Sequence, residues 1–271
     1  MELGQYKTIL VVSPHLDDGA LSVGGIIERA VANGADVVVA TAFTADAPPL
    51  THLSPLAVEL HALWDIGPNP FEQRRREDFA SIAILGARAV HGGLPDALYR
   101  TGPAGDFLYA KRQAIFGLPS EHDGIGDALF RLLDNWISEI SPDLILSPLG
   151  VGRHVDHVLT TNALHRVAEA RRVNVALYED MPYSTGLFPT AMPDTVNAAL
   201  ARTSWRVADP QVIPVDISKK LAAVAAYASQ IADIFPNGLE FESVFKDYMR
   251  NCGDGEFAER IWQTEGSPDE Q

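Results

Sequence analysis

Cysteine is almost absent from this 271-residue chain, and basic residues are scarce. The single cysteine, Cys252, cannot form an internal disulfide and lies far from every motif described below, so we interpret it as a packed or surface thiol rather than a nucleophile. Only 21 Lys and Arg residues stand against 36 Asp and Glu residues, which gives a formal net charge of −15. Because such a charge repels polyphosphate, we expect neutral or cationic ligands and no nucleic-acid partner.

Long hydrophobic runs are also missing from the sequence. No stretch approaches the roughly 20 uninterrupted apolar residues that a membrane helix needs. The first apolar run ends in His and Asp rather than in the small residues of a signal-peptide cleavage site. We therefore expect a cytoplasmic protein without a membrane span, and the sequence leaves open whether it is a monomer or a homo-oligomer. The 46% hydrophobic composition is sufficient for a substantial core.

Strand and helix patterns alternate along most of the chain. Continuous β-branched and aliphatic runs predict buried strands at about 8–13, 36–41, 88–91, 143–147, 174–178 and 211–215. Apolar stripes at helical spacing predict helices at about 21–34, 56–64, 71–85, 125–140, 156–170 and 218–232. Segment 45–70, with five prolines, predicts a long loop around the second of these helices, and segment 92–119 is irregular, either a lid or a pocket wall.

This alternation predicts one domain of the α/β class. We expect a Rossmann-like, mostly parallel sheet with helices on both faces. The α/β core would cover residues 1–180, and residues 181–271 would form a C-terminal extension.

Two polar motifs follow predicted core strands: SPHLDDG at 13–19 and RHVDH at 153–157. Ligands of open parallel sheets bind outside the carboxyl ends of the strands, so we expect the two motifs to meet there. Two imidazoles and one carboxylate, with a position left for water, suit a hydrolytic divalent metal that lowers the pKa of that water to near ~7. We therefore predict His15, Asp18 and His157 as the metal ligands.

The remaining residues of the two motifs suggest catalytic roles. Adjacent carboxylates cannot easily face the same metal, so we predict that Asp17 stays free as a general base. His154 lies one helical turn from His157 and could stabilise an oxyanion, and it could protonate a leaving amine if it is cationic. Asp156 would orient an imidazole from behind.

Other interpretations remain open at this stage. Asp17 and Asp18 could merely cap the helix that follows, and His154 and Asp156 could belong to an exposed helix start. Two histidines and a carboxylate also bind the iron of oxygenases, although the alternating α/β order argues against that class by fold analogy. A non-catalytic sugar-binding module is a third interpretation. The arginines at 74–76 would normally form a solvated helix face, but one of them could reach a ligand.

The order Pro-His-x-Asp-Asp and then His-x-Asp-His resembles the LmbE-like, or PIG-L, family of de-N-acetylases. That family includes enzymes acting on N-acetylglucosaminyl-phosphatidylinositol and on the mycothiol precursor. The likeness spans most of the chain, because the Arg-Arg-Arg-Glu run at 74–77 looks like the family's Arg-x-x-Glu helix, and Lys220 through Ser229-Gln230 looks like its C-terminal helix.

The resemblance implies zinc, or another divalent metal such as Fe²⁺, bound by the ligands predicted above. It also implies that Asp17 is the general base, that His154 is an electrostatic catalyst and that Asp156 supports His154. Relatives contact sugar hydroxyls at the positions of Arg74 and Asp96.

This chain has Leu16 and Gly19 where the commoner His-Pro-Asp-Asp-Glu motif has Pro and Glu. In this respect it is similar to members associated with antibiotic glycoconjugates, including glycopeptide pseudoaglycone deacetylases. The resemblance implies removal of an N-acetyl or other N-acyl group from a glucosamine moiety of a glycoconjugate, in secondary metabolism such as glycopeptide antibiotic biosynthesis. A mycothiol-type deacetylase or amidase is the alternative. Apolar residues of the Pro-rich loop and at 107–109 would suit a bulky aglycone.

Overall fold

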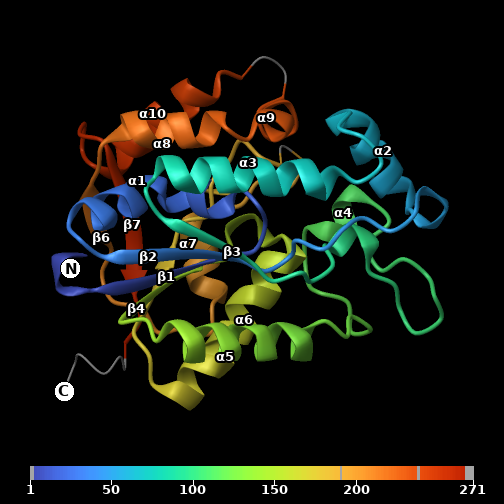
Figure 1. Cartoon of the computed structure of the whole chain (residues 1–271), viewed down its shortest axis with the longest axis horizontal. Coiled ribbons are helices and arrows are strands. Elements are labelled where there is room, and N and C mark those ends of the chain that lie inside the picture. Colours follow the sequence, from blue (N-terminus) through green and yellow to red (C-terminus); the bar gives the residue numbers. More distant parts are fainter. Residues whose placement is uncertain (1–2, 190, 237–238, 266–271) are drawn as a thin grey trace.

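A seven-stranded sheet crosses the middle of the molecule in the computed structural model, which describes residues 3–189, 191–236 and 239–265 (Figure 1). The strand order is β3-β2-β1-β4-β5-β7-β6; β1 to β5 are parallel, and β7 runs antiparallel to both of its neighbours. The prediction of a mostly parallel α/β sheet is confirmed. The strands are β1 Thr8–Ser13, β2 Asp36–Thr41, β3 Arg88–His91, β4 Leu144–Pro148, β5 Val175–Tyr178, β6 Gln211–Pro214 and β7 Ala258–Gln263.

Helices cover both faces of this sheet, with α1, α3 and α8 on one face and α5 and α6 on the other (Figure 1). The helices are α1 Asp18–Ala32, α2 Pro55–Trp64, α3 Pro70–Ile84, α4 Arg112–Ile115, α5 Gly126–Ile140, α6 Val155–Arg171, α7 Val196–Arg202, α8 Ile217–Ala225, α9 Ala228–Ile234 and α10 Phe241–Cys252. Short 3₁₀ turns lie at Leu3–Gln5, Leu50–His52, Ala97–Tyr99, Val151–Arg153 and Tyr183–Thr185.

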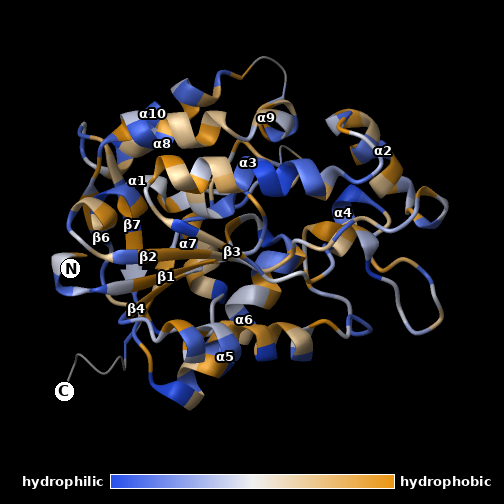
Figure 2. Cartoon of the chain, viewed as in Figure 1, coloured by the Kyte–Doolittle hydropathy of each residue, from blue (hydrophilic) through white to orange (hydrophobic). Residues whose placement is uncertain are grey.

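The apolar run of β1 explains its central place. Because side chains alternate across a strand, Ile9 and Val11 pack into the core beneath α1 and α8, whereas Leu10 and Val12 pack against α5 and α6. Val11 is paired with β2 on one side and with β4 on the other. The hydropathy colouring in Figure 2 shows the central strands β1, β2 and β4 as largely hydrophobic. Both faces of β1 are therefore buried, as its unbroken hydrophobic sequence predicts.

The C-terminal part differs from the sequence-based expectation in two ways. The helix predicted over 218–232 is two helices, α8 and α9, separated by residues 226 and 227. Tyr227, at this break, is buried, and its hydroxyl donates to Asp78 Oδ1 at 2.8 Å. The strand β7 is not apparent from the sequence, because Glu259, Arg260 and Gln263 interrupt its apolar pattern. This strand inserts between β5 and β6, so residues after 181 extend the same sheet.

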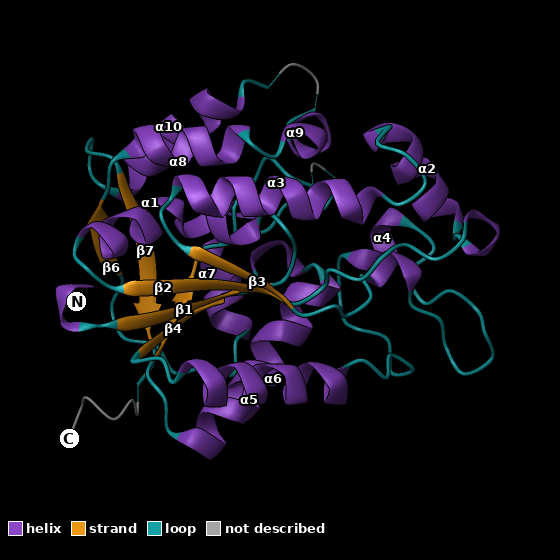
Figure 3. Ribbon diagram, viewed as in Figure 1, coloured by secondary structure: helices purple, strands orange, loops and turns teal. Residues whose placement is uncertain are grey.

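Long connecting segments gather beyond the carboxyl ends of the parallel strands (Figure 3). The segment around α2 follows β2, and the irregular segment containing α4 follows β3. The first of these contains a helix at Pro55–Trp64, close to the one predicted at 56–64. None of the helices described is both long and apolar enough to cross a bilayer.

Helix α1 approaches the chain between β6 and α8 very closely at Gly25. An ideal Cβ built on Gly25 would lie 2.6 Å from Cγ2 of Val215. The amide groups of Gly25 and Ile26 donate to the carboxylate of Glu259, at 3.0 and 2.7 Å, which fixes this part of α1 against β7. The contact leaves no room for a methyl group.

Gly25→Ala is therefore expected to lower the free energy of unfolding by about 1–2 kcal/mol. Overpacking costs about 1–3 kcal/mol, and a Cβ only 2.6 Å from Cγ2 of Val215 falls in the upper part of that range, at about 2–3 kcal/mol; the better helix propensity of alanine returns about 1 kcal/mol. Urea unfolding would measure the change. Gly126→Ala is the matched control, since no atom lies within 4 Å of its Cβ position at the start of α5. Equal stability of the two variants would contradict the packing argument.

Candidate metal-binding active site

The two sequence motifs meet at the carboxyl edge of the sheet, one after β1 and the other after β4. Ser13 shapes the first turn: its hydroxyl donates to the carbonyl of His15 at 2.6 Å and accepts from the amide of Gly19 at 3.0 Å. Asp18 Oδ2 accepts from the backbone amide of His15 at 2.7 Å. Asp17 occupies the N-cap position of α1 but makes no capping hydrogen bond, so its carboxylate is free to face the site.

Two imidazole nitrogens converge on one carboxylate oxygen. Oδ2 of Asp18 lies 3.1 Å from Nδ1 of His15 and 3.1 Å from Nε2 of His157. All three side chains are buried. Nε2 of His157 has no hydrogen-bond partner within the described part of the chain. A buried nitrogen without a hydrogen bond, beside a carboxylate and a second imidazole, fits the donor set of zinc and similar divalent metals.

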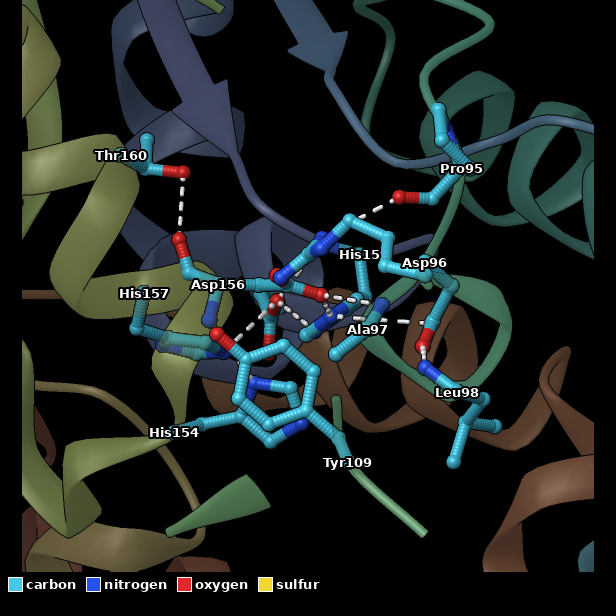
Figure 4. A network of polar contacts seen from close by, with 12 residues as sticks. His15, Pro95, Asp96, Ala97, Leu98, Tyr109, His154, Asp156, His157 and Thr160 are labelled. Carbon is cyan, nitrogen blue, oxygen red and sulfur yellow. Dashed lines mark hydrogen bonds and ion pairs between the residues drawn. The ribbon is translucent and has the colours of Figure 1, made fainter. Parts of the chain in front are cut away.

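Other combinations of donor atoms lie nearby. One nitrogen each of His15, His154 and His157 lies within 4.8 Å of the others, and so do donor atoms of His15, Asp96 and Asp156 (Figure 4). The second combination is a poor metal site, because the guanidinium of Arg100 lies 2.5 Å from Asp156 Oδ1 and already compensates that charge.

His157 is held from behind by a carboxylate that the sequence analysis missed. Its Nδ1 lies 2.6 Å from Oδ1 of Asp180, and Oδ2 of Asp180 accepts from the amides of Gly150 and Val151 at 2.8 and 2.9 Å. Such a partner fixes the tautomer and orientation of a metal-binding histidine. Asp180 is the second residue after β5, so its position at a carboxyl strand end was the available signal.

Asp156 plays the corresponding part for His15 rather than for His154. Oδ2 of Asp156 lies 3.1 Å from Nε2 of His15 (Figure 4). Its contact with His154 is through the backbone: the amide of Asp156 donates to Nδ1 of His154 at 3.2 Å. This difference from the expected pairing arises because His154 is the N-cap of α6 and accepts one of the unpaired amides of its first turn.

The protonation of His154 follows from this contact. Burial and the neighbouring His15 lower the pKa of His154 well below its usual range, so the imidazole is neutral. Since Nδ1 accepts a hydrogen bond, the proton is assigned to Nε2, which can donate. In the sequence-based prediction, His154 protonates a leaving amine only if its imidazole is cationic. The lowered pKa does not favour that form.

Asp17 faces Arg74 across the site, with Oδ2 and Nη2 3.5 Å apart. Burial, reinforced by the charge of Asp18 and opposed by Arg74, raises the pKa of Asp17 to about 6. The guanidinium of Arg74 lies over the rings of Trp64 and Phe71, 5.2 and 5.1 Å from their centroids. Nε of Arg74 has no hydrogen bond among the described residues. Arg74 is thus the arginine of the 74–76 run that lies inside the protein.

A cavity of about 110 Å³ opens above these groups. Aromatic and aliphatic side chains form most of its wall, and Asp96 and Gln230 add polar groups. The Pro-rich segment contributes Leu60 and Trp64 to the wall, but residues 107–109 are not among the lining residues. The lining side chains include Asp17, Leu60, Trp64, Arg74, Asp96, Leu98, Ile115, Phe116, His154, Tyr183, Phe188, Gln230 and Asp233.

Comparison with known proteins identifies a family that matches this chain. The family GlcNAc-PI de-N-acetylase, PIG-L, matches residues 10–168. The 2'-N-acetylparomamine deacetylase of Streptomyces fradiae is 28% identical over 224 residues, which are 83% of this chain and 74% of that protein. The 1D-myo-inositol 2-acetamido-2-deoxy-alpha-D-glucopyranoside deacetylase of Corynebacterium glutamicum is 26% identical over 66% of this chain and 59% of its own.

Solved structures resemble the chain over nearly its whole length. The zinc-inhibited form of teicoplanin deacetylase superposes with a TM-score of 0.82 and 28% identity, covering 97% of this chain and 99% of that one. The antimicrobial reagent A40926 pseudoaglycone deacetylase gives a TM-score of 0.76 and 29% identity, covering 95% and 97%. The similarity thus extends beyond the region of the two motifs to the C-terminal strands.

Proposed function

The chain belongs to the PIG-L family of GlcNAc-PI de-N-acetylases, and we propose that it is a metal-dependent hydrolase that removes an N-acetyl group from an amino sugar. The observation that carries this proposal is the convergence of His15 and His157 on Asp18, beside a carboxylate, Asp17, that takes no part in that cluster. This arrangement supports both a metal and a separate base.

A divalent metal, zinc or another such as Fe²⁺, would be held by His15, Asp18 and His157, and when bound it supplies Lewis acidity that activates water and polarises the acyl carbonyl. The oxygen of the water molecule attacks the acyl carbon, and Asp17 accepts the proton that the water loses. Nε2–H of His154 donates to the acyl oxygen as negative charge develops there.

The same proton completes the reaction. As the carbon–nitrogen bond breaks, the protonated Asp17 returns the proton to the departing amine, so acetate and the free amino sugar are the products. Arg74 and Asp96 line the cavity, and we propose that they bind sugar hydroxyls. Asp96 Oδ1 already accepts from the amide of Leu98 at 2.9 Å, which orients its other oxygen.

For the substrate, we propose a glucosamine glycoconjugate of the antibiotic type. Two observations support this choice over a mycothiol-type conjugate. Solved structures that are 28 and 29% identical and cover nearly the whole chain include a teicoplanin deacetylase and the A40926 pseudoaglycone deacetylase. The cavity wall carries Trp64, Phe116, Tyr183 and Phe188, which suit a bulky aromatic aglycone.

Acetate release from metal-loaded protein tests the proposal. A panel would compare free N-acetylglucosamine, an inositol conjugate and aryl or peptidyl N-acetylglucosaminides. We expect kcat/KM to be highest for the conjugates with an aromatic aglycone, because an aromatic group can pack against the aromatic side chains of the cavity wall. We expect no consumption of oxygen. Equal rates with the free sugar would contradict the proposed substrate class. If metal-loaded protein releases no acetate from any conjugate, the proposed reaction itself is wrong.

A further inference from the structure

We propose that Arg100 is a positioning residue of this site, which fixes the ring of His15 through the carboxylate of Asp156. The inference rests on the proposed metal-dependent function. It concerns a residue that carries no recognisable sequence signal, since Arg100 lies in the irregular segment between β3 and α5.

The first step of this connection is the contact between Asp156 and His15. Oδ2 of Asp156 lies 3.1 Å from Nε2 of His15 and accepts from the amide of Ala97 at 3.1 Å (Figure 4). A carboxylate can only accept at this contact, so Nε2 of His15 carries the proton. Nδ1 lies 3.1 Å from Oδ2 of Asp18; when a metal is bound there, the proton that Asp156 keeps on Nε2 would leave the lone pair of Nδ1 for the metal.

The second step is the fork of Arg100. Its Nη2 donates to Oδ1 of Asp156 at 2.5 Å, and its Nε donates to Oδ2 of Asp123 at 3.0 Å. Nη1 donates to the carbonyl of Pro95 at 3.1 Å. Every nitrogen of the guanidinium is therefore engaged, and Arg100 and Ala97 together hold both oxygens of Asp156.

The surroundings leave Arg100 little freedom to move. The side chain is 5% exposed and lies between the rings of Phe43 and Tyr109, 5.2 and 5.3 Å from their centroids. The hydroxyl of Tyr109 donates to the same oxygen of Asp123 at 2.7 Å. A planar guanidinium that stacks on aromatic rings and bridges two carboxylates has no equivalent in lysine.

The two histidines of the site are supported differently. Asp180, behind His157, is held by backbone amides that remain whatever the neighbouring side chains are. Asp156, behind His15, has one oxygen held by the amide of Ala97 and the other by the side chain of Arg100, both from the segment between β3 and α5. That segment also lines the cavity through Asp96 and Phe116, so it is a pocket wall that supports the site as well.

The test measures metal affinity rather than turnover. Metal-free protein would be titrated with Zn²⁺ against a chromophoric chelator, and the visible spectrum of the Co²⁺ form would report the ligand geometry. Arg100→Gln is expected to weaken Zn²⁺ binding by about 10–100-fold, the usual effect of losing a group behind a metal ligand, and to alter the Co²⁺ spectrum. Arg100→Lys should fall between this variant and wild type, because lysine can pair with one carboxylate but not with both.

Two further variants keep the test decisive. Asp123→Asn weakens the anchoring of Arg100 without removing a cation, and it should reduce the Zn²⁺ affinity to a smaller degree than Arg100→Gln. This variant serves as the test if Arg100→Gln does not fold. Lys220→Gln removes an equally buried ion pair, Lys220–Glu259 at 2.5 Å, and should lower stability without changing the Zn²⁺ affinity. Wild-type affinity and an unchanged Co²⁺ spectrum in the folded variants at 100 and 123 would overturn the inference. Failure of wild type to bind metal would instead overturn the proposed function.

Discussion

His157→Ala is expected to remove the metal and the hydrolytic activity together. The substitution takes away one of the two nitrogens that converge on Asp18, and the remaining His15 and Asp18 are too few ligands for a stable site. We expect less than one tenth of the wild-type metal content after gel filtration, and a fall in kcat/KM of at least about 10³-fold. Elemental analysis and acetate release on the same preparation measure the two quantities.

The control for this variant is His165→Ala, two turns further along α6. That imidazole lies 3.6 Å from Glu169 at the surface, far from the cluster, so metal and activity should be retained. A second variant, His157→Asn, keeps a polar group opposite the buried Asp180 and limits the loss of stability. If either substitution at 157 abolishes metal binding but leaves acetate release intact, the metal has no part in the reaction.

The sequence was sufficient to predict the parallel core of the fold. Strands such as β1 are hydrophobic at nearly every position because helices cover both faces, and this pattern is visible without any structure. The edge of the sheet was harder to predict. Polar side chains of β7 form hydrogen bonds with residues far away in the sequence, as Glu259 does with Gly25 of α1 and Lys220 of α8. The local sequence pattern of a strand does not indicate such partners.

The same distinction applies to the candidate site. His15, Asp17, Asp18 and His157 lie in two short motifs after strands, so residue type and topology were enough to nominate them. Their positions in the structure are compatible with the roles predicted for them, which remain to be tested. The supporting groups were missed or paired differently, because their roles depend on where irregular segments return in space. Arg100 comes from such a segment.

Asp17→Asn is expected to separate metal binding from catalysis. Asparagine matches aspartate in shape and can still accept a hydrogen bond from Arg74, but it cannot take a proton from water at neutral pH. We expect kcat to fall by about 10²–10⁴-fold, the usual contribution of a general base, while the Zn²⁺ dissociation constant changes by no more than a few-fold. Steady-state acetate release and the chelator titration give the two values.

This outcome distinguishes the remaining interpretations of the site. If Asp17 served only to begin α1, the variant would keep both its stability and its kcat, because asparagine is as good an N-cap residue as aspartate. The function of a sugar-binding module would also be unchanged. Asp36→Asn, an exposed position on β2, controls for the substitution of Asp by Asn itself. A folded, metal-loaded Asp17→Asn protein with wild-type kcat would exclude Asp17 as the base. Another group would then have to accept the proton, and the carboxylate of Asp96 at the cavity wall is the next to test.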